Sequence, residues 1–273
     1  MSLFEAIVLG LVQGITEFLP ISSTAHLKIV PALLGWDDPG AAYSAVIQLG
    51  TVAAVLVYFA RDLYRLTGAF IAGLIARAPF GTEDSRLAWF VGLGTIPIGL
   101  LGLLLKKRIE GELRSLYVIA GSLIVLAVVL FFIERRASHK RTLEGMTLRD
   151  GLIIGAWQAL ALIPGSSRSG TTITGGLSLG FNRESAARYS FLLSIPATGL
   201  AGIFELKHLL QASEHPPMTA MIVGTVVSFA VGMAAIAGLL KFLRTQSMMV
   251  FIVYRVLLGV ALIALLLTGV LKP

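Results

Sequence analysis

The chain has 273 residues, of which 56% are hydrophobic and 14% charged, and its formal net charge is +7. A soluble domain carries about a quarter charged residues, so this composition excludes an ordinary water-soluble fold, whose surface so few charges could not cover. The absence of cysteine excludes disulfides and thiolate chemistry, and in a membrane protein the positive charge suits cytoplasmic loops and anionic headgroups rather than nucleic acid.

Apolar residues gather in blocks that predict membrane helices. Five blocks approach the roughly 20 residues that a helix needs to cross the hydrocarbon layer: 41–60, 87–105, 116–133, 218–240 and 256–271. Shorter blocks at 3–12, 27–34, 70–76, 152–163 and 191–204 suit re-entrant or half-membrane helices, or spans that carry polar residues at one end. Because backbone polar groups cannot be left unpaired in lipid, we expect an all-α integral membrane protein, a polytopic helical bundle. The amino terminus lacks the basic region of a signal peptide and is expected to be retained.

A charged stretch, residues 134–150, separates two apolar halves, 1–133 and 151–273, of a single membrane domain. Its basic residues predict a solvated cytoplasmic loop. A second basic group, at 106–108, lies at the other end of the apolar block 116–133. The two groups compete, so the orientation in the membrane stays open.

The two halves resemble each other, which predicts an internal repeat. Gly10 and Gln13 match Gly155 and Gln158. After a one-residue gap, the Pro-x-Ser-Ser element at 20–23 matches that at 164–167. A weaker echo links Thr-Ile-Pro at 95–97 with Ser-Ile-Pro at 194–196. In membrane proteins built from two repeats, the functional site lies on interrupted segments at the repeat interface.

The first interrupted segment carries an acid, hydroxyls and an imidazole. Gln13 and Glu17 are four residues apart and share one helix face. A proline at position 20 ends that helix, and Ser22, Ser23 or Thr24 can cap the next one, which carries His26. A helix start presents free N–H groups and a positive dipole end, so it is a ready anion site.

The second segment has a stronger anion signature. Hydroxyl donors and one arginine fall within a few residues: Ser166, Ser167, Arg168, Ser169 and Thr172. A guanidinium grips phosphate oxygens in a bidentate manner. An arginine inside a membrane costs at least about 2.5 kcal/mol on insertion scales, so it is expected to have a functional role or a partner.

Together the two segments predict phosphoryl-transfer chemistry, which needs cover for phosphate oxygens, a nucleophile and a proton carrier. We expect Ser23 to be the nucleophile, because His26 lies one turn further on and can take its proton, with Glu17 orienting the imidazole or holding a cation. An activated water is the rival nucleophile. Structural roles compete at each position: helix caps for the serines, a hydrogen-bonded interior histidine, and a helix-contact role for Gln13. Arg255 is expected to be an interface anchor.

These segments resemble the bacterial undecaprenyl-diphosphate phosphatase family of the bacitracin-resistance type. Residues 13–26 resemble its Glu/Gln-x-x-x-Glu motif with Ser-Ser-Thr-x-His, and residues 164–172 its Pro-Gly-x-Ser-Arg-Ser-x-x-Thr motif. The resemblance extends over most of the chain. Gln13 stands where many members have Glu, which weakens the case for a two-carboxylate metal site.

The resemblance implies an inverted-topology repeat with two re-entrant helical hairpins in the bacterial inner (plasma) membrane. It implies release of phosphate from a polyprenyl diphosphate, which recycles the lipid carrier for peptidoglycan, with Mg²⁺ or Ca²⁺ as cofactor and Glu17 as a metal ligand. Seven residues match functional positions of the family: Glu17, Ser22, Ser23, His26, Ser167, Arg168 and Thr172. We predict that Glu17, Ser23, His26 and Arg168 are catalytic. We predict that phosphate is bound by Ser22, Ser166, Ser167, Ser169 and Thr172, with Gln13 in a supporting role. Membrane lipids are the expected surroundings, and a homodimer is one option.

Two other classes compete with the phosphatase. Broken helices in repeats also occur in transporters, so a lipid or anion transporter without hydrolytic activity is the main alternative. Transport coupled to hydrolysis is compatible with the phosphatase hypothesis. A membrane scaffold fits poorly, because so many polar groups interrupt the apolar segments.

Overall fold

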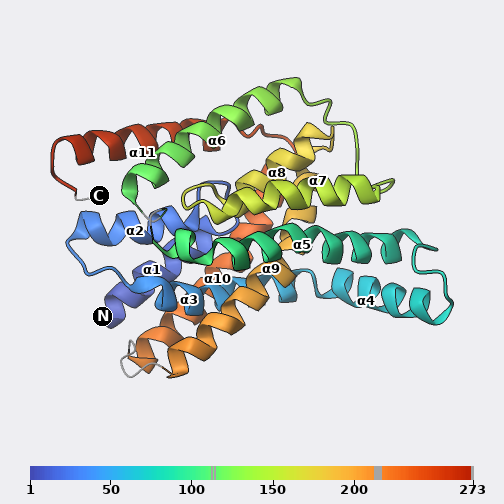
Figure 1. Cartoon of the computed structure of the whole chain (residues 1–273), viewed down its shortest axis with the longest axis horizontal. Helices are drawn as coiled ribbons and strands as arrows, with labels where there is room; N and C mark the ends of the chain where they lie inside the picture. Colours follow the sequence, from blue (N-terminus) through green and yellow to red (C-terminus); the bar gives the residue numbers. More distant parts are fainter. Residues whose placement is uncertain (112, 114, 212–216, 272–273) are drawn as a thin grey trace.

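The computed structural model describes residues 1–111, 113, 115–211 and 217–271. The elements in chain order are α1 (Leu3–Thr16), α2 (Ser23–Leu34), α3 (Gly40–Tyr58), α4 (Ala60–Ile75), α5 (Glu83–Glu110), α6 (Leu116–Arg136), α7 (Leu148–Ala159), η2 (Leu160–Leu162), α8 (Arg168–Ser178), α9 (Arg183–Gln211), α10 (Met218–Leu243) and α11 (Met249–Leu267). Within this part of the chain the regular structure is helical (Figure 1).

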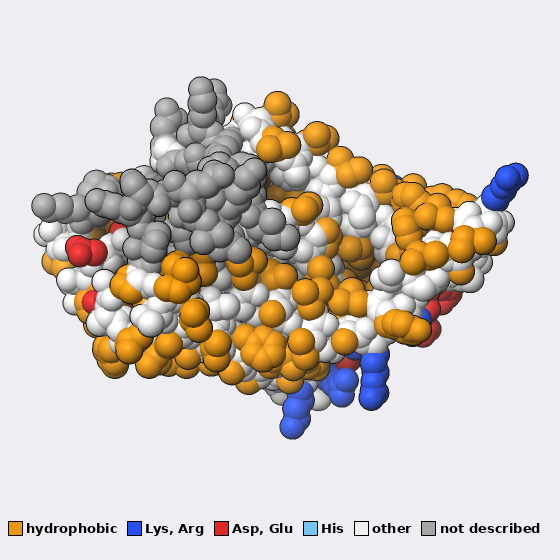
Figure 2. All heavy atoms as spheres, turned by 90° about the horizontal axis from the view of Figure 1, so that it is seen from below, with side chains coloured by type: hydrophobic (Ala, Val, Ile, Leu, Met, Phe, Trp, Pro, Cys, Tyr) orange, Lys and Arg blue, Asp and Glu red, His pale blue; other side chains and the backbone are white. Residues whose placement is uncertain are grey.

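Within the described residues, four helices are long and apolar enough to cross a membrane, and their spans cover 83–105, 116–136, 218–243 and 249–267. A fifth span arises if α3 and α4, which meet at a 74° bend, are taken together. Large apolar side chains are widely exposed on the molecular surface, and Figure 2 shows them over much of one face, with basic residues near its edge. These features confirm the predicted class, an all-α polytopic membrane protein.

The charged linker, residues 134–150, is largely exposed, as expected of a solvated segment, but it is also fastened to the bundle. Arg141 donates to both carboxylate oxygens of Asp150 (3.0 and 2.6 Å) and to the carbonyl of Leu179. Its guanidinium also stacks over the Phe181 ring. The linker is therefore fastened to the start of α7 and the end of α8.

The two hairpins, α1–α2 and α7–α8, have the same local construction. Each begins with a capping box and continues through a serine N-cap of unusual positive φ, 76° in Ser22 and 69° in Ser167. Each second helix is followed by a glycine with positive φ. These features recur at a constant sequence offset: Ser2 with Thr147, Gly10 with Gly155, Ser22 with Ser167, and Gly35 with Gly180. The sequence comparison wrongly introduced a gap, because Ser22 is equivalent in geometry to Ser167 and not to Ser166.

The two halves interlock at close glycine contacts. α1 packs against α10, and α7 packs against α5. A Cβ on Gly10 would lie 2.6 Å from the carbonyl oxygen of Gly224, and one on Gly155 would lie 2.3 Å from that of Gly94. Small residues allow helix backbones to approach this closely inside a membrane. Further contacts between the halves join α3 with α9 and α6 with α11, so both hairpin loops are enclosed by the bundle.

Candidate active site

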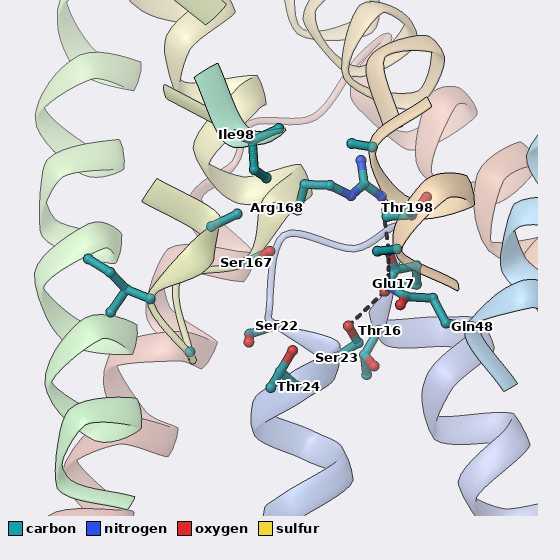
Figure 3. Close-up of a pocket in the computed structure, with 15 residues that line it drawn as sticks. Thr16, Glu17, Ser22, Ser23, Thr24, Gln48, Ile98, Ser167, Arg168 and Thr198 are labelled. Carbon is teal, nitrogen blue, oxygen red and sulfur yellow. Dashed lines mark hydrogen bonds and ion pairs between the residues drawn. The ribbon is translucent and has the colours of Figure 1, made fainter. Parts of the chain in front are cut away.

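The two hairpin loops meet in one pocket, as predicted. The hydroxyl of Ser169 donates to the carbonyl of Leu19 at 3.1 Å, and Arg168 reaches Glu17 across the interface (Figure 3). One part of the pocket wall is polar: Thr16, Glu17, Ser22, Ser23, Thr24, Gln48, Ser167, Arg168 and Thr198. The rest is mostly apolar and comes from α5, the η2 region and α9: Ile98, Ala161, Ile163, Gly165, Ala197 and Ala201.

Glu17 is the centre of the polar wall. Its Oε1 accepts hydrogen bonds from Arg168 Nη2 (3.1 Å) and Gln48 Nε2 (3.3 Å). Its Oε2 accepts from Gln13 Nε2 (3.1 Å) and Ser23 Oγ (2.7 Å). The Glu17 side chain is only 5% exposed, so its ion pair with Arg168 and the bonds from these donors lie in the protein interior.

Ser23 is the hydroxyl best placed for chemistry. It is half-buried, lines the pocket and donates its proton directly toward Glu17. Ser22, by contrast, uses its hydroxyl to cap α2, where it accepts from the N–H of Ala25. The two serines therefore differ: Ser22 caps a helix, and the Ser23 hydroxyl is hydrogen-bonded to a carboxylate at the pocket wall.

The prediction that the His26 imidazole takes the proton of the Ser23 hydroxyl is wrong for this arrangement, because neither ring nitrogen is hydrogen-bonded to Ser23. His26 Nδ1 lies 2.7 Å from the carbonyl oxygen of Ser22, and its Nε2 lies 2.6 Å from the hydroxyl of Tyr254. Both ring nitrogens are therefore engaged by other groups, with Nδ1 as donor and Nε2 as acceptor. Although Ser23 and His26 are one turn apart, their side chains take different directions from the helix, which spacing alone could not reveal.

Arg168 has the position of a phosphate clamp. Its side chain is 10% exposed, lines the pocket and contacts Glu17 through Nη2 and the carbonyl of Ser190 through Nη1. Its Nε is buried without a hydrogen-bond partner. Because a buried unmet donor is costly, this N–H is a natural point of attachment for an oxyanion.

Three of the predicted phosphate ligands lie behind the pocket wall. Ser166 has no exposed surface, Ser169 is bonded to Leu19, and Thr172 donates to the carbonyl of Arg168 while its hydroxyl pairs with that of Ser190. In this arrangement they do not line the pocket. The bonds of Ser169 and Thr172 hold the segment that presents Ser167 and Arg168.

Sequence reasoning missed Gln48 and Thr198 in the pocket wall and misjudged Arg255. Gln48 is a polar residue inside a long apolar block, which is the signal that could have identified it. Arg255 is not an interface anchor, because it is 1% exposed and donates to carbonyl groups of the second loop. An arginine near the start of an apolar run looks the same in either role until the packing is known.

The predicted metal role of Glu17 does not fit this arrangement. A carboxylate has about four lone-pair sites, and Glu17 accepts from four donors. Among the described residues, no group of three acidic or histidine side chains is placed to hold an ion. Hard cations also bind through substrate phosphates with few protein carboxylates. A divalent cation that binds together with a diphosphate therefore stays a prediction.

Fold and site together define a polytopic membrane protein with a pocket that combines a carboxylate, a hydroxyl and an arginine. The chain belongs to the family described as bacitracin resistance protein BacA, whose profile matches residues 6–261. It is 70% identical over 273 residues, all of this chain and 92% of the relative, to an undecaprenyl-diphosphatase of Myxococcus xanthus. It is 55% identical over 282 residues to an undecaprenyl-diphosphatase of Chloroherpeton thalassium, covering 100% of this chain and 99% of the relative. It is also 48% identical over 285 residues to undecaprenyl-diphosphatase 2 of Streptomyces avermitilis, covering 100% of this chain and 98% of the relative.

Proposed function

We propose that this chain is an undecaprenyl-diphosphatase, a membrane phosphatase that converts a long-chain polyprenyl diphosphate to the monophosphate and inorganic phosphate. The observation that carries the proposal is the Ser23–Glu17–Arg168 constellation: a hydroxyl 2.7 Å from a buried carboxylate that is itself 3.1 Å from an arginine facing the same pocket. The names of the relatives supply the substrate, and the constellation supplies the reaction.

The diphosphate binds where the positive groups converge. The terminal phosphate enters at the start of α8, where the helix dipole and N–H groups favour an anion. The free Nε of Arg168 meets one of its oxygens. As the guanidinium turns to the phosphate, Glu17 loses one of its donors and becomes available to accept a proton from Ser23.

In the covalent route, Ser23 Oγ forms a bond to the terminal phosphorus while the bond to the bridging oxygen breaks. The proton of Ser23 passes to Glu17 and then to the departing lipid monophosphate, which keeps the bridging oxygen. A water then attacks the phosphorus of the phosphoserine and gives a proton to Glu17 while the bond from phosphorus to Ser23 Oγ breaks. Glu17 passes this proton to the Ser23 oxygen, which restores the hydroxyl, and phosphate leaves. In the rival route, water attacks the terminal phosphorus directly and Ser23 serves as a donor. The position of His26 supports a structural role in either route.

The apolar part of the pocket suits the prenyl chain. Ile98 comes from α5, and Ala197 and Ala201 come from α9, with small side chains that leave width for a hydrocarbon. Beyond the pocket both helices carry exposed leucines, such as Leu100 and Leu200. A lipid can therefore keep its tail in the bilayer while its diphosphate reaches the polar wall.

The surroundings of this activity follow from its substrate. We propose that both hairpins are re-entrant, that the two repeats have inverted topology, and that the protein resides in the bacterial plasma membrane, where the lipid carrier is recycled. The divalent cation and the homodimer remain predictions.

Phosphate release is the test of the function. Purified protein in detergent is given undecaprenyl diphosphate, and inorganic phosphate is measured, with Ser23→Ala as the matched control. We expect release by the natural chain and at least about a hundredfold less by the variant. A well-folded natural chain that binds the lipid and releases no phosphate contradicts the proposal and favours transport without hydrolysis.

A further inference from the structure

Arg255 is a buried cation directly behind the second loop. It lies in α11 and is 1% exposed. Its Nη2 donates to the carbonyl oxygens of Ser166 (3.0 Å), Gly165 (3.4 Å) and Ser122 (3.4 Å). Its Nη1 lies against the first turn of α8, because a Cβ added to Gly170 would be 2.8 Å from that nitrogen. The guanidinium thus sits beneath the helix start that faces the pocket.

The charge of Arg255 is not offset nearby. Among the described residues, its hydrogen bonds go to backbone carbonyls, and no acidic side chain forms an ion pair with it. The acid of the pocket, Glu17, is already paired with Arg168. A buried charge without a counterion is strongly unfavourable, and it lies beside the positive end of a helix dipole, which adds to the cost. An anion bound in the pocket would offset both.

The second loop depends on this contact for its shape. Gly165 has φ +90° and lines the pocket, and the next two residues are Ser166 and the N-cap Ser167. On the other side, the Ser122 hydroxyl of α6 donates to the carbonyl of Pro164 at 2.6 Å. The loop is therefore held between α6 and α11, with its carbonyl groups drawn away from the pocket.

We propose that Arg255 is a positioning residue for the diphosphate site: it fixes the loop at Gly165–Ser167 and supplies uncompensated positive charge that draws the diphosphate into the pocket. Its neighbour Tyr254 serves the first hairpin in the same way, since its hydroxyl lies 2.6 Å from His26 Nε2. Consecutive residues of α11 thus hold both loops. The inference rests on the proposed function for its substrate class, but the charge argument concerns any diphosphate.

The test compares binding with turnover in variants of the full chain. The natural protein, Arg255→Met, Arg255→Lys and the control Arg244→Met are purified in detergent. Arg244 is an exposed arginine bonded to Glu184 outside the pocket, so the same substitution there removes a charge without touching the site. Inorganic pyrophosphate binding is measured by calorimetry, phosphate release from undecaprenyl diphosphate gives kcat and KM, and thermal melting reports folding.

We expect Arg255→Met to weaken pyrophosphate binding by at least about tenfold, because a buried charge near an anion acts through a low effective dielectric. Arg255→Lys should keep binding within about threefold but lose at least about tenfold in kcat, since an ammonium keeps the charge but not the planar fork. Arg244→Met should match the natural protein in both.

Unchanged pyrophosphate binding by folded Arg255→Met overturns the inference. If that variant does not fold, Arg255→Lys decides: normal kcat, or binding weakened as much as tenfold, overturns it. A natural chain that binds pyrophosphate in an Arg255-dependent way but releases no phosphate from the lipid refutes the proposed function alone. A natural chain that releases phosphate without binding pyrophosphate refutes the inference alone.

Discussion

Glu17→Gln is the most informative single change, because the substitution preserves shape while removing the charge that four donors share. Each carboxylate oxygen accepts from two donors, Arg168 and Gln48 on Oε1, and Gln13 and Ser23 on Oε2. The glutamine side chain has one acceptor oxygen and one donor NH₂ group. In either orientation of the amide, the NH₂ group would therefore face two of the donors that now bond to Glu17.

The magnitude follows from burial. The two side chains are 5% and 10% exposed, so Arg168 would be left in the interior without its counterion. Breaking one partner of a buried ion pair costs about 3–5 kcal/mol. The same change removes the proton acceptor beside Ser23, and general-base catalysis contributes roughly 10²–10⁴ in rate. We expect a clear loss of thermal stability and at least about a hundredfold loss of kcat.

A second variant separates the two effects. Adding Arg168→Gln to Glu17→Gln removes the stranded charge, so the double variant should regain much of the lost stability while activity stays low. Melting temperature in detergent and single-turnover phosphate release are the measurements. If Glu17→Gln keeps a tenth or more of normal kcat in a folded protein, Glu17 is not the proton acceptor and the reasoning fails.

Four further predictions follow from the same structure. Ser23→Ala should abolish formation of a labelled phosphoenzyme and lower kcat at least about a hundredfold, whereas a tenth or more of normal kcat would favour direct water attack. Arg168→Lys should lose roughly a hundredfold in kcat/KM, because a point charge replaces a bidentate fork, and near-normal turnover would exclude the clamp. Gly165→Ala should reduce both folding yield and activity, because its φ is +90° and the new Cβ would lie 2.6 Å from the carbonyl of Ile119; a normal melting curve would contradict this. For Asp150, burial opposes ionisation, but hydrogen bonds from Arg141 and Thr147 outweigh it and lower its pKa. Its stabilising effect is therefore full above the unfolded pKa of about 4 and lost as the pH falls through the lower folded value, so the natural protein and Asp150→Asn should converge in melting temperature only below about pH 4.

The class of protein and the identity of the site segments could be predicted from the sequence, because both depend on local patterns. Long apolar blocks can only be helices in lipid, whatever their neighbours. The serine and arginine clusters of the two loops are contiguous in the chain, so their anion chemistry was visible without a fold. Their union was also predictable, since Pro-x-Ser-Ser elements in two similar halves indicate a shared interface.

Tertiary packing alone decided which side chains face the pocket. Ser23 turns toward Glu17 while His26 turns toward Tyr254, although the two lie on one helix, because their partners come from different helices. Two residues from distant parts of the chain contact the site: Gln48 donates to Glu17, and Arg255 donates to the carbonyl of Ser166. Sequence periodicity reports which face of a helix is polar, but not what the neighbouring helices present to that face. For this reason the kind of chemistry could be predicted from the sequence. The proposal that Glu17, and not His26, accepts the proton of Ser23 required the fold.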